Sequence, residues 1–331
     1  MSRLIFLVLV GSMLLMACTA GSSTRPTQRA RAQPSVSLIE TPAPQSATEA
    51  AAPQAAHASG TWWQPTPGQP IHWHWQLSDD FVYPRDLLPG VTVYDLDGEL
   101  TSAQTVAQLH AANPNIKVIC YFDAGVYESY RSDAARFPAS VIGKPDVGWE
   151  NSYWLDIRQT DILLPIMTDR MQHWCKDKGF DAIEPDETEV WSNDSGFPIT
   201  RAQNNAYSIQ IAAIAHSLGL SVGLKGNTTE APDLWSYFDW MLNEQCWEFD
   251  ECDLLRDSFL NNGKAVLNIE YNVDPNCAAA NVWPMNSARR DLDLVGPTNP
   301  DYLYAPCVPD SQDFWDMTNV RRTFLPIIFR R

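Results

Sequence analysis

The stretch FDAIEPDETEVWSNDSGF, residues 180–197, begins as an apolar β-strand and runs directly into a dense group of acidic side chains. Four carboxylates fall within six positions, at Glu184, Asp186, Glu187 and Glu189. A short apolar run bounded by polar residues is typical of a strand buried inside a sheet. The kind of sheet decides where this charge lies.

Short apolar runs alternate with helical patterns from residue 61 onward. Helices are expected over 101–113, 161–179 and 199–219, the last starting with a Thr200/Gln203 capping pair and ending at Gly219. Strand and helix in alternation predict a parallel sheet. The seven predicted strands cover residues 71–77, 91–97, 116–122, 180–186, 220–226, 238–244 and 265–271.

An eighth strand would close such a sheet into a barrel. We expect it within DLVGP, 293–297, or YLYAPCV, 302–308. The alternative is an open, doubly wound sheet, but the first strand is followed by no glycine-rich phosphate-binding turn. We therefore predict a single (β/α)₈ TIM-like barrel over residues 61–331.

Charged side chains end most of the predicted strands. A lone acid in such a position is usually a helix cap or a solvated loop residue. In a (β/α)₈ barrel, however, the carboxyl ends of all strands meet at one mouth, which holds the active site. Acids at most strand ends therefore predict an acidic bowl. Its expected residues are Asp95, Asp97, Asp123, Glu184, Asp186, Lys225, Glu244 and Glu270.

The first 60 residues have the composition of an export signal and a tether. Residues 3–18 place Arg3 before an apolar run that is too short to span a bilayer and that ends Leu-Met-Ala-Cys. This ending resembles a bacterial lipobox, which predicts a signal peptide over 1–17 and lipidation of Cys18; the alternative is an ordinary signal with a chance cysteine. Residues 18–60 are rich in Ala, Pro and Ser, which predicts a disordered tether.

The remaining chain is strongly acidic. The whole sequence has a net charge of −17, and residues 1–60 hold four Arg against two Glu, so residues 61–331 carry −19. Such a surface repels nucleic acid and anionic lipid and attracts a cationic ligand. Solubility alone also explains acidity. We expect no nucleic-acid partner, and contact with a membrane only through the lipid anchor.

Six cysteines remain after Cys18, an even number that suggests disulfides in an exported chain. Cys246 and Cys252 bracket a short loop that a bond would clamp, and Cys277 with Cys307 is the next plausible pair. Cys120 and Cys175 have apolar neighbours, and we expect buried free thiols. His72 and His74 alternate on a predicted strand, which favours a core or pocket role over metal binding. No metal or other cofactor is expected.

Paired carboxylates at a barrel mouth suit glycoside hydrolysis, in which one acid protonates the leaving oxygen and the other attacks or activates water. All 13 Trp follow residue 61, and Trp154, Trp191 and Trp247 are placed to stack on sugar rings, although about half of the tryptophans are expected in the core. No G-x-S-x-G motif is present, which argues against a serine esterase.

Long collinear motifs lie between about residues 61 and 275. They are WHWQL (73–77), VYDLD (93–97), KVICYFDAGVYESYRSDAARFP (117–138), YWLDIR (153–158), GFDAIEPDETE (179–189), AIAHSLGLSVGLKGN (213–227), FDWMLNEQCWEFDEC (238–252) and GKAVLNIEYN (263–272). This set resembles glycoside hydrolase family 114, the endo-α-1,4-polygalactosaminidases. Family members often read EPDN and LKNN where this chain has EPDE and LKGN.

The resemblance implies an exopolysaccharide substrate of α-1,4-linked galactosamine, partly or wholly deacetylated and therefore cationic. It also implies Asp186 and Glu244 as the catalytic pair, and we favour Asp186 as nucleophile or base and Glu244 as acid. The other bowl residues and Trp191 would line the subsites of a monomeric enzyme. The alternatives are a non-catalytic, surface polysaccharide-binding lipoprotein and a barrel hydrolase that acts on a different glycan.

Overall fold

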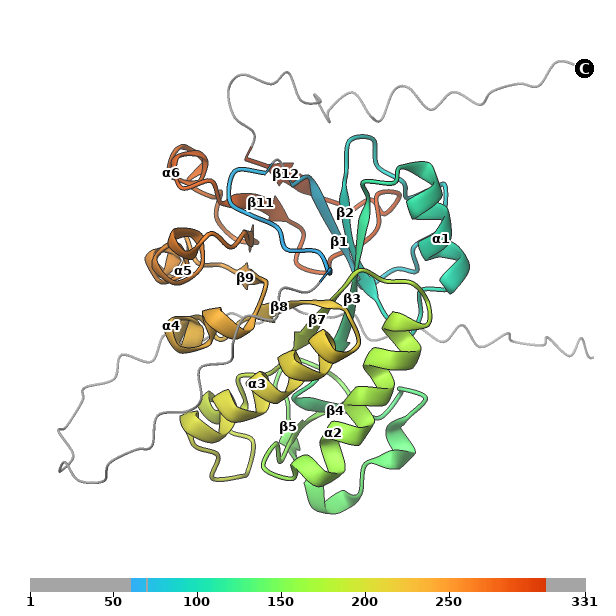
Figure 1. Cartoon of the computed structure of the whole chain (residues 1–331), viewed down its shortest axis with the longest axis vertical. Coiled ribbons are helices and arrows are strands. Elements are labelled where there is room, and N and C mark those ends of the chain that lie inside the picture. The colour runs from blue at the N-terminus through green and yellow to red at the C-terminus, as the bar shows by residue number, and fades with distance from the viewer. Residues whose placement is uncertain (1–60, 70, 308–331) are drawn as a thin grey trace, which may run out of the picture.

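A computed structural model describes residues 61–69 and 71–307; the expected signal peptide, Cys18 and tether lie outside these residues. Its centre is a curled nine-stranded sheet (Figure 1). The first eight strands run parallel in chain order, and the ninth is antiparallel. In spatial order they are β1 Trp73–Gln76, β2 Val93–Asp97, β3 Lys117–Asp123, β7 Ala182–Asp186, β8 Ser221–Lys225, β9 Trp240–Glu244, β10 Val266–Glu270, β11 Asn286–Arg290 and β12 Tyr304–Pro306.

All seven predicted strands are present, but the eighth is not where we expected it. The eighth parallel strand is β11, with the sequence NSARR, whereas 302–308 contains the antiparallel edge strand β12. The polar composition of β11 does not fit the apolar pattern by which the other strands were predicted. Its Arg290 is fully buried and donates to the carbonyls of Trp75 on β1, Leu303 and Val295.

The sheet curls until its first and last parallel strands approach each other. Arg290 of β11 bonds the Trp75 carbonyl at 2.7 Å, and Leu77 N donates to the Leu294 carbonyl at 3.1 Å. Within the described residues, these contacts join β1 and β11 in place of a strand ladder. The architecture is thus a TIM-barrel-like parallel sheet with a loosely closed seam.

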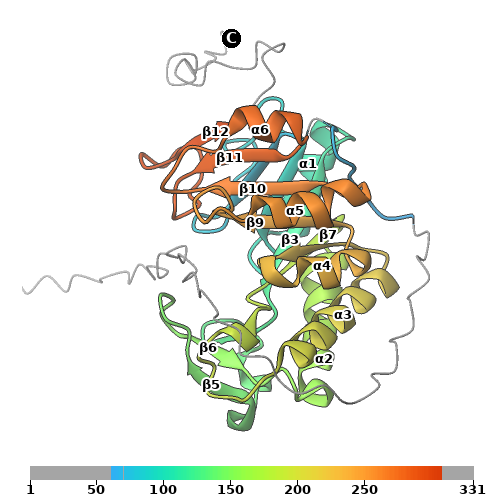
Figure 2. The same ribbon diagram turned by 90° about the vertical axis from the view of Figure 1, so that its left-hand side faces the viewer.

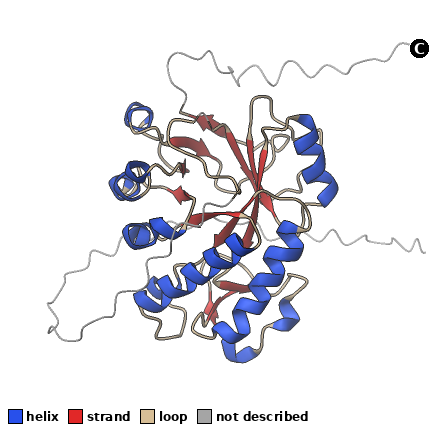
Figure 3. Ribbon diagram, in the orientation of Figure 1, coloured by secondary structure: helices blue, strands red, loops and turns tan. Residues whose placement is uncertain are grey.

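Helices cover the outside of the curled sheet (Figure 3). The predicted capping box of Thr200 and Gln203 is present at α3. The β1–β2 connection, residues 77–92, contains turns and no helix, which departs from a complete (β/α)₈ repeat because two prolines and Gly90 interrupt it. The helices are α1 Ala103–Ala112, α2 Thr160–Asp169 with its π-helical continuation Arg170–Lys176, α3 Arg201–Ser217, α4 Ala231–Leu234, α5 Cys252–Ser258 and α6 Cys277–Val282.

A second, three-stranded sheet lies between β3 and α2 in the chain and was not predicted. Its strands are β4 Val126–Glu128, β5 Ile142–Pro145 and β6 Ser152–Leu155, in the order β4-β6-β5. Figure 2 shows it at the opposite end of the molecule from α6 and β12. The loop between β5 and β6 carries Trp149 toward the barrel mouth.

The barrel interior is filled by indoles packed against very small residues. Trp73, Trp75 and Trp240 are buried there together. A Cβ atom added to Gly223 on β8 would lie 2.5 Å from the Trp240 ring, so only glycine leaves room for this indole. Trp240 Nε1 donates to Ser221 Oγ at 3.0 Å. The interior is therefore a packed core, and substrate can enter only from the mouth.

Three disulfides link the described residues. Cys246 is bonded to Cys252, as predicted, and Cys277 is bonded to Cys307. The expectation of free thiols at Cys120 and Cys175 was wrong, because these two residues form a third bond. Their apolar surroundings are real, since both are fully buried, but burial did not reveal that the fold brings them together from 55 positions apart.

Candidate active site

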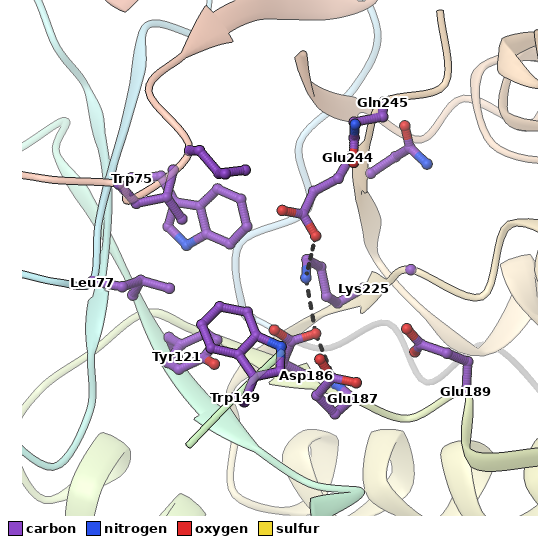
Figure 4. A pocket seen from close by; sticks show the side chains of 14 residues that line it. Trp75, Leu77, Tyr121, Trp149, Asp186, Glu187, Glu189, Lys225, Glu244 and Gln245 are labelled. Carbon is purple, nitrogen blue, oxygen red and sulfur yellow. Dashed lines mark hydrogen bonds and ion pairs between the residues drawn. The ribbon is translucent and has the colours of Figure 1, made fainter. Parts of the chain in front are cut away.

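Three neighbouring strands each end in a charged residue that points into the barrel mouth. Asp186 ends β7, Lys225 ends β8 and Glu244 ends β9. Lys225 Nζ lies 2.8 Å from Asp186 Oδ1 and 2.9 Å from Glu244 Oε2. Figure 4 shows the lysine between the two carboxylates. The site is thus built around one cation shared by two acids.

The chain turns sharply away after each of these three residues. Glu187, Gly226 and Gln245 have φ values of 55°, 58° and 65°, in the left-handed region. This conformation costs a non-glycine residue roughly 1–2 kcal/mol, and such strain clusters at functional sites. The turns leave each charged side chain at the rim, with the backbone directed away from the pocket.

Additional hydrogen bonds orient the two carboxylates differently. Glu187 N donates to Asp186 Oδ1 at 2.7 Å, the same oxygen that Lys225 contacts. Within the described residues no donor reaches Asp186 Oδ2. Tyr271 O–H donates to Glu244 Oε1. The Asp186 side chain is 11% exposed and that of Glu244 is 25% exposed. Asp186 is therefore the more tightly held acid, and Glu244 is the more open to solvent.

Burial alone would lower the pKa of Lys225, but the neighbouring charges reverse that effect. The carboxylates of Asp186, Glu244 and Glu184 raise the pKa of Lys225 well above its usual value. The side chain is therefore a permanent cation at physiological pH. Its charge compensates the two acids without neutralising them by proton transfer.

Aromatic side chains form the opposite wall of the pocket, which encloses about 690 Å³ when the space open to solvent is included. Figure 4 shows the indoles of Trp75 and Trp149 facing the carboxylates across this space. Trp75 also lies 5.2 Å from Lys225 Nζ. Apolar faces beside polar groups are what a sugar ring requires. The remaining wall comes from Leu77, Tyr121, Glu187, Glu189, Gly226, Asn243, Gln245, Leu292 and Leu294.

A smaller second pocket adjoins the first and shares Tyr121, Trp149 and Glu187 with it. Burial and the carboxylates of Asp146, Glu189, Asp186 and Asp123 raise the pKa of Glu187 well above its usual value. No lysine or arginine lines this pocket within the described residues. The other side chains in its wall are Asp123, Val126, Glu128, Tyr130, Asp146 and Ser152. The extension is thus acidic and short of cations.

The other predicted bowl residues have different locations. Asp123 lines the second pocket, but Asp95 and Glu184 are fully buried beneath the first. Asp97 is bound by Arg131 at 2.7 Å. Glu270 accepts hydrogen bonds from Trp247 N and Glu248 N, so it holds the loop that follows Glu244.

The predicted stacking tryptophans lie outside both pockets. Trp191, on the 3₁₀ helix Val190–Ser192, and buried Trp154 pack against the core between sheet and helices. Trp247 stacks on Trp283 at 5.4 Å and donates from Nε1 to Ser287 Oγ. Of the two histidines, His74 is fully buried, bonds Gln76, and has its pKa lowered to about 3 by burial, so it belongs to the core.

The described parts of the chain contain no group of three or more His, Cys, Asp or Glu arranged to hold a metal ion. They also include no helix with the length and apolar character needed to cross a bilayer. What the mouth offers is carboxylates, one lysine and aromatic faces.

Comparison with known proteins identifies the family. The family model of "Glycoside-hydrolase family GH114" matches residues 52–307, well over half of the chain. The chain belongs to family GH114. It is therefore a glycoside hydrolase, and the predicted resemblance is confirmed.

Two solved structures are similar to this GH114 chain. The crystal structure of Aspergillus fumigatus Ega3 in complex with galactosamine is 30% identical, with a TM-score of 0.64 over 71% of this chain and 95% of that one. The structure of the glycoside hydrolase domain of PelA from Pseudomonas aeruginosa is 14% identical and has a TM-score of 0.49. The match covers 70% of this chain and 97% of that one. No curated protein sequence matches.

Several wall residues of this GH114 site were missed by the sequence reasoning. Trp75 and Leu77 alternate with the histidines in HWHWQL, so the period of a strand could have placed them in the barrel interior. Tyr271, which bonds Glu244 without lining the pocket, directly follows the predicted strand-end acid Glu270. Trp149 had no local signal, because the unpredicted small sheet delivers it from an exposed loop.

Proposed function

We propose that this enzyme is an endo-acting hydrolase of α-1,4-linked, deacetylated galactosamine polysaccharide, with Asp186 and Glu244 as its catalytic pair. The observation that carries the proposal is the pairing of these two strand-end carboxylates around Lys225, opposite an aromatic wall. The crystal structure of Ega3 with galactosamine, at 30% identity, supports the class of sugar.

The geometry supports a separate role for each acid. Asp186, held at Oδ1 by Lys225 and by Glu187 N, offers Oδ2 to attack the anomeric carbon. Glu244, the acid more open to solvent, takes up a proton from water and gives it to the leaving glycosidic oxygen. Glu244 then takes a proton from water, which attacks the same carbon and releases Asp186. No cofactor is required.

The spacing of the two acids supports a retaining mechanism. Lys225 Nζ lies 2.8 Å from one carboxylate oxygen and 2.9 Å from the other, so these oxygens are no more than about 6 Å apart. Retaining glycosidases have carboxyls about 5–5.5 Å apart, whereas inverting enzymes keep them about 6.5–9.5 Å apart to admit a water molecule.

The acidic extension supports a cationic substrate. Protonated amines on successive sugars would meet the carboxyl groups of Asp123, Asp146 and Glu187 in the second pocket, whose described lining residues include no cation; its fourth acid, Glu128, is already paired with Arg131. We also propose, on the ending of residues 3–18 alone, that Cys18 anchors the enzyme as a monomer at the cell surface.

The test is hydrolysis of purified, deacetylated galactosaminogalactan by residues 61–331, with product sizes followed over time and anomers followed by NMR. We expect a rapid fall in polymer length and an initial α-anomer. Binding without cleavage would support the non-catalytic polysaccharide-binding protein, and cleavage only of another glycan would support a different specificity. An initial β-anomer would overturn the retaining assignment alone.

A further inference from the structure

Two carboxyl groups lie directly beneath the catalytic pair, in the closed interior of the barrel. Asp95 is on β2 and Glu184 is on β7, and neither has any exposed surface. Their side chains are within hydrogen-bonding reach of each other. Within the described residues no donor group reaches any of their four oxygens. Two ionised carboxylates cannot bond each other, so a bond between them requires a proton on one.

The buried pair also contacts the cation of the active site. Glu184 lies two positions before Asp186 on the same face of β7, and its Oε1 is 3.9 Å from Lys225 Nζ. Lys225 is therefore faced by three carboxyls. Two are in the pocket, at 2.8 and 2.9 Å, and the third is below it. The charge of Glu184 determines whether Lys225 has a competing partner away from substrate.

We propose that Asp95 and Glu184 share a proton that stays on Glu184, and that Glu184 in this neutral form is a positioning residue that keeps Lys225 bridging Asp186 and Glu244. This inference rests on the proposed catalytic pair. An ionised Glu184, entirely removed from water, would attract Lys225 more strongly than the partly hydrated pocket carboxylates do. Lys225 would then move toward Glu184 and away from the pocket, and Asp186 would lose one of its two hydrogen-bond donors.

The electrostatics of the interior favour this proton. Burial, followed by the charge of Asp95, raises the pKa of Glu184 well above its usual value. Burial raises the pKa of Asp95 to about 7, although the bond from Glu184 and the charge of Lys225 oppose this shift. Asp186 is the other charged group facing both. Above about pH 7, Asp95 is therefore the ionised member and Glu184 is the proton donor.

Amide substitutions separate this role from simple packing. Glu184→Gln keeps a neutral donor toward Asp95, so we expect kcat to fall less than about threefold. Asp95→Asn reverses the bond, because the amide donates to Glu184 and stabilises its ionised form beside Lys225. We expect kcat to fall at least about tenfold, with KM little changed and a larger loss as pH rises. The double variant restores a neutral pair and should recover most of that loss.

The control is Asp86→Asn, which removes a buried acid that bonds Arg85 and Gln76 outside the site. Each rate is corrected for the folded fraction. Equal losses in the two single variants, with the double variant slower than either, would show a packing role and overturn the proposal.

A second measurement is independent of activity. The difference between the infrared spectra of the native protein and Glu184→Gln at about pH 8 should contain a protonated-carboxyl band, because any band from Glu187 is common to both proteins and cancels. If this difference band is absent, the shared proton does not exist, whatever the rates. If the band is present but wild-type enzyme does not cleave the polymer, the proposed function fails while the buried proton stands.

Discussion

Two cations in this enzyme each lie within 4 Å of three carboxyl groups, but in different surroundings. Lys225 has Asp186, Glu244 and Glu184 at 2.8, 2.9 and 3.9 Å. Arg131 has Asp97, Glu128 and Glu99 at 2.7, 2.7 and 3.5 Å. Arg131 and Glu128 are 2% exposed, and Asp97 is 9% exposed, whereas Glu244 opens to the pocket at 25%.

The difference shows what separates a structural acid from an available one. The rigid guanidinium of Arg131 bonds Glu128 and Asp97 through separate nitrogens, and Tyr130 also bonds Glu128. Burial would raise the pKa of Glu128, but Arg131 lowers it to about 2. Lys225 is a point charge that contacts only Oδ1 of Asp186 and leaves its Oδ2 open to the pocket. Asp97 and Asp186 both end strands, and only the second faces substrate space.

The catalytic pair should give the largest effect. We expect Asp186→Asn and Glu244→Gln each to lower kcat by about a hundredfold or more, because each amide removes a single nucleophile or proton donor. The melting temperature should change little, since shape is kept. Asp194→Asn, which changes an exposed carboxylate paired with Lys144, is the control. Wild-type rates in both variants would exclude this assignment.

Replacing Arg131 should lower the stability of the fold far more than the catalytic rate. Arg131→Met leaves Glu128 and Asp97 without a buried counter-ion, which costs about 3–5 kcal/mol, while the rate per folded molecule falls less than about tenfold. Thermal and urea unfolding measure the loss. Arg136→Met, which breaks an exposed pair with Asp169, should cost under about 1 kcal/mol. Equal losses in both variants would contradict the distinction between the two networks.

The sequence was sufficient to predict most strands of the large sheet, because buried parallel strands are continuous apolar runs. It failed for β11, whose stability comes from Arg290 bonding carbonyls of β1 and of later loops. The same limit applied to the disulfide of Cys120 and Cys175. Each of these features depends on a partner distant in sequence, which local pattern does not contain.

The candidate site was predicted to a similar degree. Strand-end position correctly brought Asp186, Lys225 and Glu244 to one mouth. Strand-end position could not show that Arg131, 34 positions later, would bind Asp97. It also could not show that Asp95 and Glu184 are fully buried, one layer of side chains below the mouth. Trp149 reaches the pocket only because the small sheet folds back on the mouth.

Salt should weaken the binding of a cationic substrate to the carboxylates of the pocket around Lys225. If protonated amines are attracted by the pocket carboxylates, KM for deacetylated polymer should rise about tenfold between low and high ionic strength. Fully N-acetylated polymer should be cleaved more slowly and with little salt dependence. Initial rates on both polymers over a salt series measure this. Identical activity on the two polymers would show that the pocket carboxylates do not attract the substrate amines, and that their role is only catalytic.

The disulfide beside Glu244 should have a smaller effect. Cys246 and Cys252 close a short loop, so their bond contributes no more than about 2–3 kcal/mol. Glu270 and Asn243 also hold this loop through backbone donors. We expect replacement of both cysteines by Ser to lower kcat a few-fold through Glu244 placement. Cys277→Ser with Cys307→Ser, away from the site, is the matched control.

The smallest effect should come from Glu187, which combines a strained backbone with a carboxylate. At φ 55° asparagine is better tolerated than glutamate, so the turn alone should make Glu187→Asn more stable by about 1 kcal/mol. The bond from residue 187 N to Asp186 remains, so kcat should change little. Because burial, Asp146 and Glu189 favour the protonated form of Glu187, KM should also rise only slightly. Glu187→Gln separates the two causes, since it removes the acid but keeps the strain: at pH 7 it should give only the gain that follows from the raised pKa of Glu187, and Glu187→Asn should exceed it by about 1 kcal/mol. A stability gain in Glu187→Gln equal to that in Glu187→Asn would show that the gain came from relieved carboxylate repulsion and not from the left-handed turn.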